Sequence, residues 1–123
     1  MASIEEVQSY IISNWNAEHV GEGSLRLEAE LGEGRTQMVF ATIVGDILAI
    51  SSPFAKEESI TEELALHLSS NTFFGVKVFG GFYVLQHIIF VEDLDASEID
   101  KGLALIASFA DQLESTLGNR DNL

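Results

Sequence analysis

The sequence contains no cysteine, which excludes disulfide bonds, thiol chemistry and metal sites held by cysteine. Basic residues are also scarce, because 6 Lys and Arg stand against 20 Asp and Glu and give a net charge of −14. Such a surface repels nucleic acids and anionic membranes, so we expect neither as a partner. The charge serves either solubility or the docking of a basic protein.

Targeting signals and long apolar runs are scarce as well. The first ten residues, MASIEEVQSY, lack the basic start and apolar stretch of a signal peptide, so we expect a cytoplasmic protein. Residues 73–91, FFGVKVFGGFYVLQHIIFV, approach the length of a membrane span. However, Lys77, Gln86 and His87 interrupt this segment, and Gly80-Gly81 lies in its middle. We therefore predict two strands joined by a tight turn.

Catalytic motifs are absent: the chain has no H-E-x-x-H, no G-x-S-x-G and no phosphate-binding loop. Glu63 and His67 are four residues apart and would share a helix face, and His87 lies in a predicted strand among apolar residues. We interpret the first two as a solvated pair and His87 as a core or interface residue. We expect no enzyme, no catalytic or metal-binding residue and no cofactor. A small enzyme around His87 or the Glu63–His67 pair is the alternative.

The remaining composition is typical of one packed domain. The chain has 123 residues, of which 46% are hydrophobic, and it contains eight Phe. We predict a single domain at residues 1–118, followed by a frayed tail at 119–123.

Periodicity and turn residues predict an α+β domain with the order α-β-β-β-α-β-β-α. Five strands are predicted, at residues 24–31, 36–44, 47–52, 73–79 and 82–91. Three helices are predicted, ending near Trp15, Ser70 and Gly118. Capping boxes at Ser3–Glu6 and Ser59–Glu62 open the first two helices. Residues 16–23 read as a loop, and Pro53 is expected to end its strand. Most connections are hairpins, so the five-stranded sheet is mainly antiparallel.

The stretch VEDLDASEID, residues 91–100, holds five acidic residues. A calcium-binding loop would need glycine at its sixth position and glutamate at its twelfth. Counted from the first aspartate, those positions hold Glu98 and Ala104. Asp95 as N-cap, with Glu98 three residues later, explains the stretch as the start of the last helix.

The predicted sheet has more apolar surface than the helices can cover. It would be about 24 Å wide, and two helices, each about 10 Å wide, would cover one face. The short second helix would shield only part of the other face, although the second to fifth strands are apolar on both faces. A second copy of the chain is the simplest cover; the alternative is that the second helix and loops suffice. The candidate dimer or partner-binding residues are Phe73, Phe74, Val76, Val78, Phe79, Phe82, Tyr83, Leu64 and Leu68.

The order of elements and the acidity resemble the class I type III secretion chaperones and the related YbjN-like proteins, described as sensory transduction regulators. The likeness in residues lies at 88–113, where the strand in FYVLQHIIFVEDL passes into the helix of DASEIDKGLALIASFADQL. The resemblance implies a homodimeric binding domain and carries over no site residues. Secretion chaperones wrap an extended client segment around apolar patches on their dimer.

Two functions follow from the sequence. The first is a dimeric, chaperone-like domain that docks a protein segment by apolar contact or by adding it to a sheet edge. The second is a monomeric sensory domain that binds a small ligand between helix and sheet.

Overall fold

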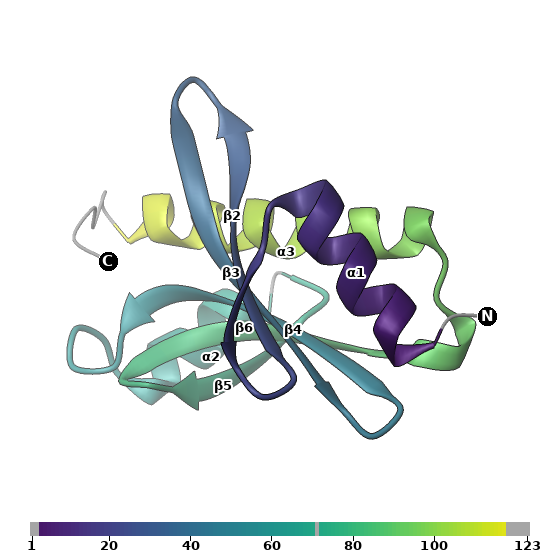
Figure 1. Ribbon diagram of the computed structural model, residues 1–123. Coiled ribbons are helices and arrows are strands. Elements are labelled where there is room, and N and C mark those ends of the chain that lie inside the picture. The colour runs from purple at the N-terminus through teal and green to yellow at the C-terminus, as the bar shows by residue number, and fades with distance from the viewer. Residues whose placement is uncertain (1–2, 71, 118–123) are drawn as a thin grey trace.

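The computed structural model describes residues 3–70 and 72–117 (Figure 1), so the predicted tail and the predicted helix end at Gly118 lie outside the described residues. The described residues form one antiparallel sheet, in the order β1-β2-β3-β4-β6-β5, and three α-helices. The helices are α1 (Ile4–Trp15), α2 (Glu62–Ser69) and α3 (Ala96–Thr116), and a short 3-10 helix (Val91–Asp93) precedes α3. The strands are β1 (Glu18–Gly21), β2 (Ser24–Gly32), β3 (Arg35–Val44), β4 (Ile47–Lys56), β5 (Gly75–Phe79) and β6 (Phe82–Phe90).

The sheet has six strands rather than the five predicted. The additional strand is β1, which lies in the segment predicted as a loop and pairs with the start of β2. All four of its residues are exposed, so it has no alternation of apolar and polar residues for the sequence to reveal. Arg26 of β2 donates through Nε and Nη2 to the carboxylate of Glu18 in β1 and reinforces this pairing.

The strand that contains Pro53 does not end there, contrary to the prediction, but continues to Lys56. Backbone pairing of β4 with β3 ends two residues before Pro53, which has no N–H to donate. Side-chain hydrogen bonds take the place of the missing backbone hydrogen bonds between β3 and β4. Ser52 Oγ donates to the Met38 carbonyl at 2.6 Å, and Gln37 Nε2 donates to the Pro53 carbonyl at 2.7 Å. Because Gln37 and Ser52 are both buried, these bonds hold the two strands together inside the protein.

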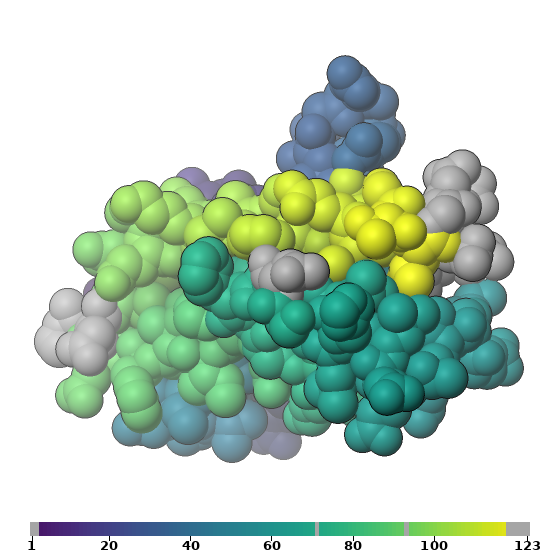
Figure 2. All heavy atoms as spheres, turned by 180° about the vertical axis from the view of Figure 1, so that it is seen from behind, coloured from purple at the N-terminus to yellow at the C-terminus, as the bar shows by residue number. Residues whose placement is uncertain are grey.

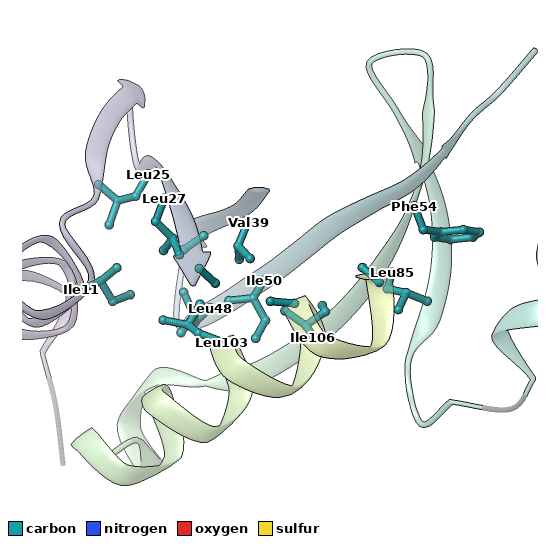
Figure 3. Close-up of a cluster of buried hydrophobic side chains, with 14 of the residues drawn as sticks. Ile11, Leu25, Leu27, Val39, Leu48, Ile50, Phe54, Leu85, Leu103 and Ile106 are labelled. Atoms are coloured by element: carbon teal, nitrogen blue, oxygen red, sulfur yellow. The ribbon is translucent and has the colours of Figure 1, made fainter. Parts of the chain in front are cut away.

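All three helices lie on the same face of the sheet. Figure 3 shows Ile11 of α1, Leu27 of β2 and Leu103 of α3 directed into one core. The prediction that the second helix shields the opposite face is wrong, because Ala65 and Leu68 of α2 belong to the same core. Figure 2 shows α2 and the segment after it beside α3. Within the described residues, no helix covers the other face of the sheet.

β4 contains a bulge near its C-terminal end. The register between β4 and β6 shifts between Pro53 and Ala55, so Phe54 is an extra residue. Phe54 and Ala55 are both buried on the helical face, and the Phe54 ring stacks on Tyr83 at 6.5 Å. The bulge therefore extends the apolar floor of the helical face at the end of the sheet where α2 packs.

The local signals at two helix starts and one turn are confirmed. Capping boxes open α1 at Ser3 and α3 at Asp95. The capping box predicted at Ser59 is wrong, because Thr61 caps α2 and accepts a hydrogen bond from the Leu64 N–H. Residues 73–91 contain the hairpin of β5 and β6, joined at Gly80-Gly81. None of the described helices is long and apolar enough to cross a membrane.

Candidate functional site

The face of the sheet without a helix, called the outer face below, has a charged part and an uncharged part. On β2 its outward residues include Arg26, Glu28 and Glu30. On β3, β4 and β6, twelve successive outward positions, opposite in parity to the buried core residues, carry no charge; beyond them, the end of β4 carries the outward Lys56 opposite Phe82. These twelve residues, called the uncharged face, are Met38, Phe40, Thr42, Val44, Ile47, Ala49, Ser51, Pro53, Val84, Gln86, Ile88 and Phe90.

At one end of the uncharged face, called the closed end, neighbouring side chains cover the strands. At the other end, called the open end, the side chains are exposed to solvent. At the closed end, the rings of Phe40 and Phe79 meet edge to face at 5.8 Å, although β4 and β6 lie between their strands. Only a strongly twisted sheet allows this contact, and Figure 1 shows β2 and β3 crossing the direction of β5 and β6. Val84 is 1% exposed here. At the open end, Val44 is 65% exposed and Ile88 and Phe90 are each 53% exposed.

A groove follows the charged part of the outer face. It has a volume of about 860 Å³ and lies between the C-terminal end of α1 and the strands β2 and β3. Its lining residues are Asn14, Trp15, Asn16, Glu18, Arg26, Leu27, Glu28, Glu30, Thr36 and Met38. Glu18 pairs with Arg26, whereas neither Glu28 nor Glu30 forms an ion pair with a described residue. The groove therefore has an excess of negative charge.

The groove runs beside a free strand edge. β1 pairs with β2 only from Ser24 to Arg26, so residues 27–32 of β2 have no strand partner on that side among the described residues. The backbone groups along such an edge are available to pair with another extended chain. A free edge, an adjacent hollow and unpaired carboxylates therefore occur together at this place.

Asp100 fixes the helix that borders the groove. Tyr10 Oη donates to Asp100 Oδ2 at 2.8 Å, and Trp15 Nε1 donates to Asp100 Oδ1 at 2.8 Å. The hydrogen bond to Asp100 raises the pKa of Tyr10, with smaller contributions from burial and from the charge of Asp100. Sequence reasoning assigned the acidic stretch to a helix start and missed this joint, because no local pattern links residues 85 or more positions apart.

The predicted dimer or partner-binding residues do not form one surface. Leu68 and Tyr83 lie in the core, so we leave them out of the proposed contact surface. Phe74, Val76 and Phe82 are half-buried, and the Phe74 ring packs against Phe109 of α3 at 5.7 Å. The exposed members are Leu64, Phe73 and Val78 around α2 and β5, and Phe79 on the outer face. Val44, Ile88 and Phe90 are also exposed and apolar but were not among the predicted residues, although alternation along β3 and β6 could have placed them opposite the core.

The histidine sites offer no constellation for chemistry. Glu63 and His67 are both exposed on α2, as a solvated pair would be. His87 is half-buried, and its ring meets Phe74 edge to face at 5.4 Å, as expected for a core or interface histidine. Within the described part of the chain, no group of three or more His, Cys, Asp or Glu could hold a metal ion.

The sequence matches no protein-family model and no curated protein. Its structure, however, is similar to a chain in the crystal structure of the ExsC–ExsE complex. The TM-score is 0.65 at 14% identity, over 94% of this chain and 96% of that one. It is also similar to a chain of the HopA1–SchA chaperone–effector complex. That TM-score is 0.58 at 12% identity, over 80% of each chain.

The fold of this chain is therefore similar to that of the matched chains in these two complexes. This likeness confirms the predicted α+β class and supports the resemblance to secretion chaperones at the level of the fold. The YbjN-like part of the resemblance stays a prediction. At identities of 14% and 12% the likeness concerns the fold alone and transfers no residue role to this chain.

Glu114 on α3 predicts a pH dependence of stability. Burial, and secondarily the charge of Asp111, raises the pKa of Glu114 from 4.5 to about 7. Between these two values the folded protein binds more protons than the unfolded chain, so the free energy of unfolding falls as the pH rises. We expect Glu114→Gln to remove this fall, as measured by urea unfolding at pH 5 and pH 7.5. The control Glu58→Gln, in an exposed loop, should keep it. An unchanged pH slope in Glu114→Gln would contradict the assignment.

Proposed function

We propose that this chain is a non-enzymatic, chaperone-like homodimer that binds an extended segment of another protein. Two observations together carry the proposal. The fold is shared with chains of the ExsC–ExsE complex and of the HopA1–SchA chaperone–effector complex. In addition, one face of the sheet is covered by none of the described helices. An uncovered sheet face with exposed apolar side chains is typical of an interaction surface.

The segment would dock at the free edge of β2. Residues 27–32 can accept an additional strand, and the adjacent groove can hold its side chains. Trp15 and Met38 offer apolar contact there, while Glu28 and Glu30 favour a segment that carries Lys or Arg. We therefore infer a partly basic, extended client segment, in agreement with the acidic surface of the whole chain.

The tryptophan in the groove provides a test, because Trp15 is the only tryptophan of the chain. A ten-residue peptide of alternating Lys and Val should change the Trp15 fluorescence on binding, and a peptide of alternating Glu and Val should not. The double substitution Glu28→Lys with Glu30→Lys should weaken binding by about tenfold or more, because two attractions become repulsions worth roughly 1 kcal/mol each.

The matched control is Glu57→Lys with Glu58→Lys, which changes the net charge equally in an exposed segment that does not line the groove. It should leave the affinity within about twofold at moderate ionic strength, because distant exposed charges are screened. Equal losses in both double variants, or no binding of the Lys–Val peptide, would contradict docking at β2.

The alternative of a monomeric small-ligand domain has less support. It requires a pocket between helices and sheet, but large side chains such as Ile50, Leu103 and Ile106 fill that layer. A groove of about 860 Å³ instead borders the outer part of β2 and is open to solvent. A groove of this form suits an extended chain better than an enclosed metabolite.

A further inference from the structure

The open end of the uncharged face is a contiguous apolar surface. Register places Val44, Ile47 and Phe90 in one row across β3, β4 and β6. Thr42, Ala49 and Ile88 form the next row. Neighbouring strands are about 4.8 Å apart, and successive outward residues on one strand are about 7 Å apart, so the side chains of the two rows adjoin. The exposed Val44, Ile88 and Phe90 therefore belong to one patch.

The lack of charge limits what can cover this patch. Charged residues make up 21% of the chain, yet none occupies the twelve positions of the uncharged face, and the outward Lys56 of β4 lies beyond its closed end, away from this patch. A basic partner, which the net charge of −14 would attract, would bury Lys or Arg here without a carboxylate to pair with. A second copy would bring the same uncharged surface. Two chains of −14 repel each other, so an uncharged contact is the arrangement that costs them least.

The size of the surface also fits a second copy. Three strands at about 4.8 Å and four outward residues on each at about 7 Å give a flat area of roughly 400 Å². Side-chain relief and the rim increase that area toward the roughly 800 Å² per partner that is common in stable complexes. Two such sheets can pack face to face at about 10 Å, and a two-fold axis lets each copy use the same residues.

The other exposed edge of the sheet is poorly suited to self-pairing. β5 is an edge strand of five residues with Lys77 at its centre. Antiparallel pairing of β5 with its own copy, centred on that residue, would place two Lys77 side chains opposite each other. Like charges directly opposite destabilise a strand pair, and lysine is a residue that protects sheet edges from such pairing.

We propose that the homodimer forms by two-fold packing of the uncharged face on its copy, with Val44, Ile88 and Phe90 at the centre of the contact. This inference rests on the proposed function, which requires a homodimer but does not depend on the surface that forms it. β2 lies outside the contact, and Met38 is the one groove residue that also belongs to the uncharged face, so the parts of both client grooves formed by α1 and β2 stay free.

Light scattering coupled to size exclusion at micromolar concentration tests the proposal on the full chain. Wild type should be a dimer. Ile88→Glu and Ile88→Lys should each raise the dimer Kd by about 100-fold or more, because both bury an unpaired charge in each copy. The two variants separate the cost of burying a charge from the effect of net charge. Glutamate makes each chain more negative and lysine makes it less negative, so repulsion between the chains alone would weaken the dimer of the glutamate variant and tighten that of the lysine variant. Val44→Glu, at the most exposed position, is the second variant in case Ile88 variants unfold.

Leu105→Glu is the matched control, because Leu105 is 50% exposed on α3 and thus on the helical side. It should stay dimeric, and circular dichroism should show that all variants are folded. A dimeric wild type whose dimer survives the Ile88 and Val44 variants would overturn this surface and leave the proposed homodimer standing. A monomeric wild type would overturn both. Dissociation by Leu105→Glu, with dimers retained in the Ile88 variants, would move the interface to the helices.

Discussion

Replacing Phe54 with alanine is expected to lower the free energy of unfolding by about 3–5 kcal/mol. Phe54 is fully buried at the bulge of β4, and its ring stacks on Tyr83 at 6.5 Å. The substitution would open a cavity at the end of the core where α2 packs, because the small neighbouring side chain of Ala55 cannot replace the Phe54 ring. For a domain of this size, the loss is a large fraction of the total stability.

The matched control is Phe73→Ala, the same substitution at a residue that is 92% exposed. It should change the free energy of unfolding by less than about 0.5 kcal/mol, because no buried contact is lost. Both values come from urea titrations at one pH. Similar losses in the two variants would show that Phe54 does not support the core in the way described.

The second large effect is expected for Gly102→Leu, which should destabilise the protein by about 3 kcal/mol, at the upper end of typical overpacking costs. Gly102 lies on α3 against the sheet, where an added Cβ would be 3.2 Å from Ile50 Cδ1 and 3.5 Å from Ile89 Cδ1. The further carbons of leucine have no room between the helix and the two side chains. The helix must then move away from β4 and β6.

Gly102→Ala separates this steric effect from helix propensity. Its single methyl group meets only the flexible ends of two isoleucines, and alanine favours a helix over glycine by about 1 kcal/mol. We expect a change near zero by the same urea titration. If the leucine variant were as stable as the alanine variant, α3 would not be held at the distance seen here.

One sheet can serve two kinds of contact because its outer face is divided by strand. β2 carries the charged residues and the free edge, whereas β3, β4 and β6 carry the uncharged face. In the strand order, β2 lies beside β3 toward one edge, so pairing through the uncharged face does not use the edge of β2. We therefore expect substitutions at Ile88 to weaken the proposed dimer and substitutions at Glu28 to weaken the proposed client binding, each without the other.

The sequence by itself determined the features that depend on residues close together along the chain. The capping boxes at Ser3 and Asp95 and the tight turn at Gly80-Gly81 follow rules that act within about four residues. The alternation in β2 placed its core residues, and the excess of apolar strand residues predicted an uncovered surface. The acidic stretch at 91–100 was correctly interpreted as a helix start.

Only the tertiary structure decided the features that depend on distant partners. β1 has no alternation of buried and exposed residues, and it forms a strand because its backbone pairs with the edge of β2. β4 passes Pro53 because Gln37 and Ser52 supply the missing hydrogen bonds. α2 packs on the same core as the bulge residue Phe54, which leaves the outer face without a helix among the described residues. Each of these outcomes depends on residues that meet only after the chain has folded, so no local pattern in the sequence could reveal it.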